Sequence, residues 1–279
     1  MKKSFLRKED LEDFRRYLIL EEKSGATLEK YMRDAETFRR FLRGKELSKE
    51  TVMAYKKQLT ERGYAVRSIN SMLASVNSLL RFLGREDCRV KSIRLQPSPF
   101  CPEEKELTKA EYFRLLDAAK SNPRLYLILQ TICGTGIRVS ELAYFTAESV
   151  KRGKITVACK GKTRVVFIPS KLRGQLVKFI RKQHICSGPI FRTHKGNPLH
   201  RSVIWQEMKS LCKRAMVNPA KVFPHNLRKL FARTFYDREN DLAKLADILG
   251  HSNINTTRIY IMTTGAEHQR KIDRLGLVV

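Results

Sequence analysis

Acidic residues are scarce in this sequence, whose 279 residues include 28 Asp and Glu against 56 Lys and Arg. The formal net charge of +28 is far from the near-neutral balance of ordinary enzymes, so it indicates a polyanionic partner. Nucleic acid and an anionic membrane surface both fit such a charge. Because the sequence has no uninterrupted apolar span and no lipidation signal, we expect nucleic acid and no membrane.

The sequence also shows neither the pattern of a signal peptide nor paired cysteines. The N-terminus is basic but lacks the apolar stretch of a signal peptide, so we expect a cytoplasmic protein. The six cysteines are scattered without a Cys-x-x-Cys pair, which argues against a disulfide framework and a zinc site. The sequence also has no metal-ligand spacing and no Gly-rich phosphate loop.

Four amphipathic helices are expected in the first 84 residues, and the fourth is the clearest. Its apolar stripe is expected in the core and contains Ile69, Met72, Leu73, Val76, Leu79, Leu80 and Leu83. A second face of that helix is small and polar, with Ser68, Asn70, Ser71, Ser75, Asn77 and Ser78. This face suits close approach to sugar and phosphate, and it equally fits a plain solvated surface, so both interpretations stay open.

Prolines mark the boundary between two expected domains. Three of them fall within residues 97–102, where they favour an extended connector. We therefore expect an N-terminal helical domain at 1–88, a linker at 89–106 and a second domain at 107–279. A capping-box pattern at residues 108–111 begins the second domain.

The second domain departs from the helical pattern in its middle. Strand-like runs at 155–158 and 165–168 indicate a β-hairpin with a basic tip, and a short third strand is expected at 189–191. The pattern is otherwise helical, so the fold class is mainly α with a small β-hairpin or sheet, an α+β chain. A helix from about 203 to 216 carries the single Trp205, which we expect in the core rather than stacked on a base.

Groups that suit a phosphate lie near the C-terminus. His225 and Arg228 are three residues apart, which places both on one face of a helix. The arginine fork matches two phosphate oxygens, and an imidazole transfers protons near pH 7. The sequence LGHSNINTTRIY then adds His251 and Tyr260. A free tyrosine hydroxyl is only ~0.1% ionised at neutral pH, so it needs a proton acceptor and nearby cations to act as a nucleophile.

A further arginine lies upstream in TGIRVSEL, where a helix end and a glycine turn precede a new helix that opens with Arg138. A Lys-Gly-Lys hairpin tip follows at 160–162. Taken in order, Arg138, the hairpin tip, His-x-x-Arg, Leu-Gly-His and Tyr260 resemble the tyrosine recombinases, most closely their compact Xer-type members. The resemblance covers the whole catalytic half of the chain.

The resemblance implies a transesterification at a DNA phosphate. Tyr260 would attack phosphorus and stay joined to the 3′ phosphate, while Arg138 and Arg228 would stabilise charge on the non-bridging oxygens. His251 would bind a phosphate oxygen or support the site, and Glu141 would orient one of these groups or form an exposed helix pair. Because this step conserves bond energy, we expect no cofactor and no metal.

Proton transfer is implied for two further residues. Lys160, which directly precedes the hairpin glycine, would protonate the leaving 5′ oxygen, and His225 would assist proton movement at the nucleophile. The hairpin is one residue shorter than the family pattern between Gly161 and Lys162, so Lys162 stays open as the alternative. A second departure is Lys229, which stands where a histidine often follows the motif arginine.

The resemblance also implies the architecture and the partners. It predicts a four-helix core-binding domain and a C-terminal catalytic domain on double-stranded DNA, in a homo- or hetero-tetramer on two DNA sites. The tail at 263–279 would dock on a neighbouring subunit. A septal DNA translocase stays open as an activator.

Four functions fit a basic, mainly helical chain with these residues. Chromosome or plasmid dimer resolution is the first expectation, and a mobile-element integrase or excisionase of simple architecture is the alternative. A type IB topoisomerase would share the chemistry but relax supercoils without site preference. A regulatory DNA-binding protein would also be basic and helical, and the absence of a covalent DNA adduct would distinguish it.

Overall fold

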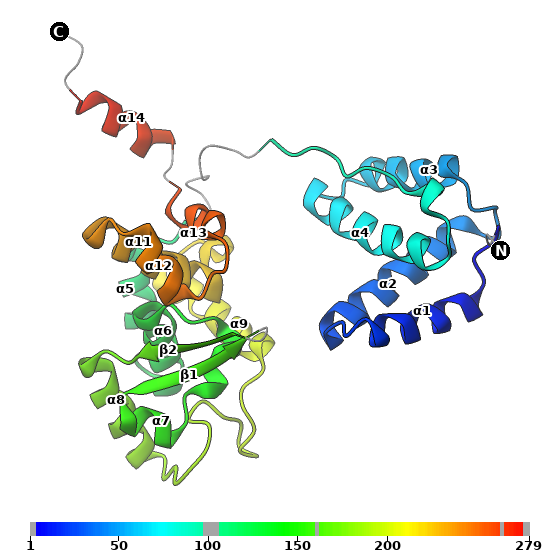
Figure 1. Ribbon diagram of the computed structural model, residues 1–279. Coiled ribbons are helices and arrows are strands. Elements are labelled where there is room, and N and C mark those ends of the chain that lie inside the picture. The colour runs from blue at the N-terminus through cyan, green and yellow to red at the C-terminus, as the bar shows by residue number, and fades with distance from the viewer. Residues whose placement is uncertain (1–3, 97–105, 160–161, 263–264, 276–279) are drawn as a thin grey trace. The chain divides into compact units, whose positions relative to one another are not determined.

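Two compact units, Met1–Pro97 and Ser98–Val279, make up the chain in a computed structural model that describes residues 4–96, 106–159, 162–262 and 265–275 (Figure 1). Both units are mainly helical. The described residues form one sheet of two antiparallel strands, which confirms the expected mainly α fold with a small hairpin. Within those ranges, no helix has the length and apolar character needed to cross a membrane.

The N-terminal unit contains the four expected helices and one short 3₁₀ turn. Their bounds are α1 Lys8–Leu20, α2 Gly25–Leu42, α3 Lys49–Glu61, α4 Val66–Phe82 and η1 Glu86–Cys88. The apolar stripe of α4 is buried against the other three helices, with Ile69, Leu73 and Val76 fully inaccessible to solvent. The helical periodicity of the sequence therefore identified this core.

Two asparagines on the polar face of α4 bind the chain that follows the helix. Asn77 pairs with both backbone groups of Val90, at 2.9 and 3.1 Å. Asn70, two turns earlier, pairs in the same way with Ile93, at 2.9 and 2.8 Å. This part of the polar face is thus covered by the following chain and is not plain solvated surface. The beginning of the segment expected as a linker is fixed to the N-terminal unit.

The second unit holds the hairpin and the remaining helices. Their bounds are α5 Lys109–Ala118, α6 Pro123–Thr135, η3 Val139–Tyr144, α7 Ala147–Arg152, β1 Lys154–Cys159, β2 Lys162–Phe167, α8 Ser170–Lys182, α9 Arg201–Ser210, α10 Cys212–Ala215, η4 Pro219–Lys221, α11 Pro224–Glu239, α12 Leu242–Leu249, α13 Ile254–Ile261 and α14 Gly265–Asp273. The strands pair from Lys154 with Phe167 to Cys159 with Lys162.

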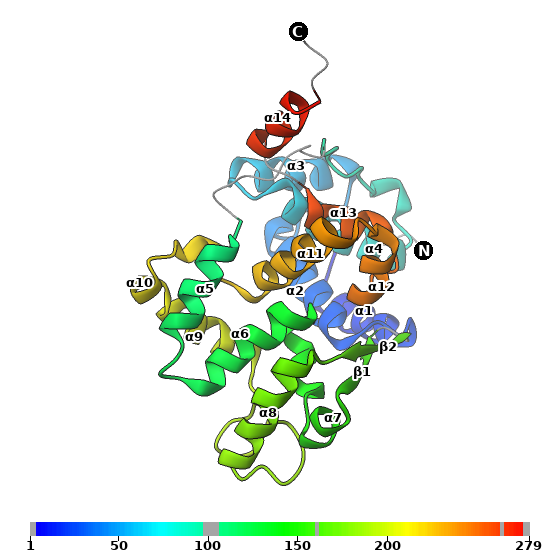
Figure 2. The ribbon, with the colours of Figure 1, turned by 90° about the vertical axis from the view of Figure 1, so that its left-hand side faces the viewer.

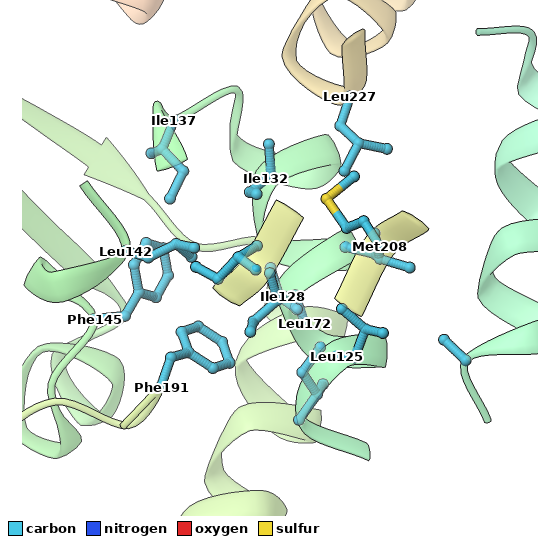
Figure 3. Close-up of a cluster of buried hydrophobic side chains, with 14 of the residues drawn as sticks. Leu125, Ile128, Ile132, Ile137, Leu142, Phe145, Leu172, Phe191, Met208 and Leu227 are labelled. Carbon is cyan, nitrogen blue, oxygen red and sulfur yellow. The ribbon is translucent and has the colours of Figure 1, made fainter. Parts of the chain in front are cut away.

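Helix α6 is the centre of this unit and packs against α5, α8, α9 and α11 (Figure 2). Its Ile128 and Ile132 lie among side chains from these elements, including Leu172 of α8, Met208 of α9 and Leu227 of α11 (Figure 3). A helix surrounded in this way needs apolar residues on most of its circumference, which the sequence from Leu125 to Ile132 provides. The end of α6 consequently has a fixed position, and the glycine turn before Arg138 begins there.

The helix expected after the Gly136 turn is present as the 3₁₀ helix η3, with Arg138 at its N-cap. Two other expectations for this unit are wrong. Residues 189–191 form no strand, because Pro189 makes a single bridge to Thr146 while Ile190 and Phe191 are buried as irregular chain. The helix expected at 203–216 is divided into α9 and α10.

Trp205 is also not a core residue, since 46% of it is exposed. The inner face of α9 is occupied by Ile204 and Met208, which are fully buried and four residues apart. Trp205 follows Ile204 directly and is therefore rotated about 100° around the helix, away from that face. Its ring instead lies 5.3 Å from the ammonium of Lys209, within cation–π distance.

Candidate active site

Arg228 is the buried centre of the site, with only 2% of its surface exposed. Its Nη1 donates to the carbonyl oxygen of Gly136 at 2.5 Å, and its Nη2 donates to the carbonyl oxygen of Leu249 at 2.8 Å. These carbonyls lie at the C-terminal ends of α6 and α12, where unpaired carbonyl groups and the helix dipoles favour a cation. Burial and the charge of Arg138 lower the pKa of Arg228 to about 10, so it stays protonated at neutral pH.

Gly136 allows the chain to turn tightly at the end of α6, where its carbonyl group meets Arg228. Its φ is +64°, in the left-handed region that glycine tolerates, and a Cβ there would lie 2.4 Å from the ring of Phe231. The same turn leads through the buried Ile137 to Arg138. The glycine in TGIRVSEL thus brings two predicted site residues to one end of α6.

His251 lies between Arg228 and Thr257. Its Nε2 is 3.0 Å from Nη2 of Arg228, and its Nδ1 is 2.9 Å from the Thr257 hydroxyl. A guanidinium only donates, so Nε2 accepts and Nδ1 carries the proton, which it donates to Thr257. Burial, followed by the charges of Arg228 and Arg138, lowers the pKa of His251 to about 4. The ring is therefore neutral at pH 7.

Tyr260 is enclosed by three of the other predicted residues. It lies on α13 with 7% of its surface exposed, and its ring centroid is 5.0 Å from that of His225 and 5.1 Å from that of His251. The guanidinium carbon of Arg228 is 5.8 Å from the tyrosine ring centroid. Desolvation and the charge of Arg228 lower the pKa of His225, which favours the neutral imidazole, a proton acceptor.

Arg138 joins the site through a buried carboxylate. Its Nη1 donates to Glu141 at 2.9 Å, and its backbone N–H donates to the other oxygen of the same carboxylate at 2.7 Å. Nη2 of Arg138 is 3.5 Å from the carbonyl oxygen of Gly250, the residue before His251. Arg138 remains 35% exposed, whereas the side chain of Glu141 is 5% exposed. Glu141 is thus a buried partner of Arg138 and not part of an exposed helix pair.

Arg164 is a residue of this cluster that the sequence analysis missed. From β2 it donates to both oxygens of Glu141, at 3.1 and 2.7 Å. Burial alone would raise the pKa of Glu141, but hydrogen bonds from Arg164 and Arg138 outweigh that effect and lower it. Strand alternation contained the signal, because Arg164 is two residues before the buried Val166 and therefore on the inner face of the hairpin.

The hairpin lysine is the one predicted site residue that the structure does not place. Lys160 lies outside the described residues, and the side chain of Lys162 does too. Lys229, the departure in the His-x-x-Arg motif, has its ammonium 2.6 Å from the carboxylate of Glu106. The assignment of the hairpin lysine stays a prediction.

The assembled groups form a cationic cluster. Arg138 and Arg164 share the carboxylate of Glu141, and Arg228 binds His251 and two backbone carbonyl groups. These three arginines and one carboxylate leave a net charge of about two beside Tyr260 when both histidines are neutral. Such a charge matches the additional negative charge of a phosphodiester under attack. In the described part of the chain, no three His, Cys, Asp or Glu side chains are grouped to bind a metal.

Comparison with known families identifies both units. Residues 105–267 match the phage integrase family, and residues 11–87 match the N-terminal SAM-like domain of phage integrases. The tyrosine recombinase XerA of Pyrococcus furiosus is 30% identical over 100% of this chain and 98% of its own length. The tyrosine recombinase XerD of Halalkalibacterium halodurans is 29% identical over 86% of this chain and 85% of its own length.

Solved structures share the fold. A crystal structure of XerA recombinase matches with a TM-score of 0.55 and 24% identity, covering 97% of this chain and 99% of the other. A lambda integrase dimer bound to a COC′ core site matches with a TM-score of 0.76 and 18% identity, covering 94% and 96%. The expected fold, an N-terminal helical domain followed by a catalytic domain, is confirmed.

Proposed function

The chain belongs to the phage integrase family, as a site-specific tyrosine recombinase of Xer type, and we propose that it cuts and rejoins duplex DNA through a phosphotyrosine at Tyr260. The observation that carries this proposal is the enclosure of one tyrosine by a buried guanidinium and two imidazoles, with ring and guanidinium distances of 5.0 to 5.8 Å. A structural tyrosine has no need of such neighbours, whereas a nucleophile needs a proton acceptor and cations.

Cleavage exchanges one phosphodiester bond for another. The Tyr260 oxygen attacks phosphorus as the bond to the 5′ oxygen breaks, and the tyrosine becomes joined to the 3′ phosphate. The tyrosine proton passes to the neutral ring of His225, and Lys160 gives a proton to the leaving oxygen. Rejoining reverses these steps with the 5′ hydroxyl of the partner strand.

The arginines stabilise the charge that develops during this exchange. Arg228 is held rigidly by the carbonyl groups of Gly136 and Leu249, so little reorganisation accompanies the reaction. Arg138 is partly exposed and binds a second phosphate oxygen. His251 is neutral and accepts from Arg228, which favours its supporting role over direct protonation of the phosphate.

The assembly is proposed to be a tetramer, of one or two kinds of subunit, on two DNA sites. All described side chains of α14 are exposed, including the apolar Ile272 and Leu275. The catalytic unit has a cavity of about 220 Å³ between α5 and α11, lined by Tyr112, Phe113, Leu230, Phe231 and Phe235 among others. The tail of one subunit fills this cavity of its neighbour, because an exposed apolar segment and an open apolar cavity on one chain favour exchange between copies.

The cellular role is proposed to be resolution of chromosome or plasmid dimers in the cytoplasm, by similarity to the XerA and XerD proteins. A septal DNA translocase would be the matching activator of a chromosomal role. The alternative is a mobile-element recombinase, because a transposon integrase in complex with transposon end DNA has the same fold, with a TM-score of 0.71.

The test of the chemistry is the variant Tyr260→Phe on a duplex whose nick lets the cleaved end diffuse away. The wild-type protein should accumulate a denaturant-resistant protein–DNA adduct, and the variant should form none. Its duplex affinity should stay nearly unchanged, because one hydroxyl contributes little to a large electrostatic interface. Tyr236→Phe on α11 is the matched control and should form the adduct normally. An adduct that persists without the Tyr260 hydroxyl contradicts the proposal.

A further inference from the structure

A carboxylate within a phosphate site requires explanation. Glu141 is almost completely buried and ionised, and it lies against Arg138, a proposed phosphate ligand. A carboxylate beside a phosphodiester repels it, and it also competes with the phosphate for the guanidinium donors of Arg138. Glu141 is therefore compatible with phosphate binding only if its charge is balanced by another group.

Arg164 supplies that balance. Two parallel hydrogen bonds join its guanidinium to both oxygens of Glu141, at 3.1 and 2.7 Å, which is the strongest arrangement for this pair of groups. Arg138 donates to the same carboxylate through Nη1 alone, while its Nη2 lies 3.5 Å from the Gly250 carbonyl. Because Arg164 occupies both carboxylate oxygens, Glu141 offers Arg138 no free bidentate site, and the second Nη of Arg138 stays available to another acceptor.

The side chain of Arg164 also packs against the turn before His251. Gly250 has a φ of +65°, and a Cβ on it would lie 2.8 Å from Cδ of Arg164. This turn presents the Leu249 carbonyl to Arg228 and then leads to His251. Arg164 therefore contacts the two parts of the site that hold the arginines, one through Glu141 and the other through the backbone at Gly250.

We propose that Arg164 is a positioning residue for DNA cleavage, which neutralises Glu141 and so leaves the guanidinium of Arg138 available to the scissile phosphate. This inference rests on the proposed function. Strand β2 would thus orient Arg138 through Arg164, a role separate from the proton transfer proposed for the lysine at the hairpin tip. The inference also explains why β2 has an arginine on its inner face beside apolar residues.

The test is a double-mutant cycle on the rate of adduct formation with the nicked duplex. Arg164→Met should slow cleavage by ~10²-fold, because Arg138 would turn onto the unbalanced Glu141 and the transition state would lose one oriented cation. Glu141→Gln removes the charge that Arg164 balances. In that background, Arg164→Met should cost less than ~10-fold, because the neutral amide no longer competes for Arg138.

The control is Arg173→Met. Arg173 likewise joins two separate segments through its guanidinium, but it donates to the carbonyl groups of Val150 and Lys151, outside the site. Its loss should leave the adduct rate within about twofold of wild type. If Arg164→Met alone fails to fold, comparison of Glu141→Gln with the double variant still measures the cost of losing Arg164 when no buried carboxylate needs balancing. A loss above ~10-fold in that comparison overturns the proposal.

A second substrate separates positioning from a general structural defect. A methylphosphonate at the scissile position has no charge on its non-bridging oxygen, so it needs less positive charge from Arg138. The deficit of Arg164→Met relative to wild type should shrink on this substrate. An equal deficit on both substrates, or no recovery in the Glu141→Gln background, overturns the proposal.

A direct DNA contact would give a different result. If Arg164 bound a phosphate itself, Arg164→Met would weaken duplex binding and reduce the salt slope by about one, and Glu141→Gln would not restore cleavage. A failure of the proposed function itself would be recognised by a different result, because the Tyr260→Phe variant would then still form an adduct. With Tyr260 essential and no coupling between positions 141 and 164, only the role of Arg164 is wrong.

Discussion

Single residues in the site are held in one protonation state by their neighbours. His251 accepts from Arg228 at Nε2 and donates from Nδ1 to Thr257, so protonating it would direct a second N–H at a guanidinium. Thr257 is fully buried on α13, six residues after His251 and three before Tyr260. The second threonine of the LGHSNINTTRIY motif thus fixes the tautomer of its histidine.

This arrangement predicts a pH dependence of stability. The pKa of His251 is lowered from 6.5 to about 4, so between these values the unfolded chain binds a proton that the native chain does not. The free energy of unfolding should therefore fall as the pH decreases from 6.5 toward 4. His251→Asn should lose this contribution, and its free energy of unfolding in urea should decline less over that interval. The exposed His194→Asn is the control, and an unchanged slope in His251→Asn would contradict the assignment.

Sequence reasoning identified most of the residues that the structure gathers at Tyr260. His225 and Arg228 are three residues apart on one helix, and His251 belongs to the continuous LGHSNINTTRIY motif, so both patterns are visible in the sequence. The same reasoning missed Arg164, since a basic residue near a hairpin tip is ordinarily solvent-facing. Strand alternation places Arg164 on the face of Val166, but only the structure shows that this face meets a carboxylate 23 positions earlier.

Among the secondary-structure elements, the hairpin carries the main open question of the mechanism. Lys160 and Lys162 flank its tip glycine, and the resemblance to the family favours Lys160 as the general acid. Lys160→Ala should cleave an ordinary phosphodiester slowly but recover on a substrate with sulfur at the 5′ bridging position, because a thiolate leaves without a proton.

Lys162→Ala and Lys154→Ala serve as comparisons, the latter at the far end of β1. A lysine that only contacts phosphate should weaken duplex binding and show no recovery with sulfur. Recovery of Lys162→Ala in place of Lys160→Ala would move the role to the other side of the glycine. Rates of strand cleavage on the two matched substrates decide between them.

Other elements show where local patterns are insufficient. The run at 189–191 has strand composition but no partner strand, so it is buried as irregular chain instead. Helix α8 was not predicted, since Gly174 interrupts its second turn and costs about 1 kcal/mol relative to alanine. Its Leu172, Leu176 and Phe179 nevertheless lie on one face, and burial against α6 and α7 outweighs that cost.

At the scale of the whole molecule, the C-terminal tail is expected to decide assembly. Deleting residues 266–279 removes the exposed Ile272 and Leu275, and every described side chain between 266 and 275 is exposed. The truncated protein should bind a single DNA site normally but fail to bring two sites together. Gel mobility on one site and analytical ultracentrifugation with two sites measure these properties separately.

The substitution Phe113→Ser is the complement of this deletion. Phe113 is more than half exposed and lines the cavity proposed to receive the tail, so its loss should impair synapsis while the tail is intact. Strand exchange at full rate in the truncated protein would show that the tail packs on its own subunit or serves no assembly role.

The paired hydrogen bonds of Asn70 and Asn77 set the length of the tether between the two units. With Ile93 fixed to α4 and Glu106 buried in the second unit, 12 residues separate the anchored positions, compared with the 18 of the segment 89–106. When both units hold one duplex, a shorter tether raises the effective concentration of the second unit. Asn70 and Asn77 would then increase avidity through the backbone that they bind.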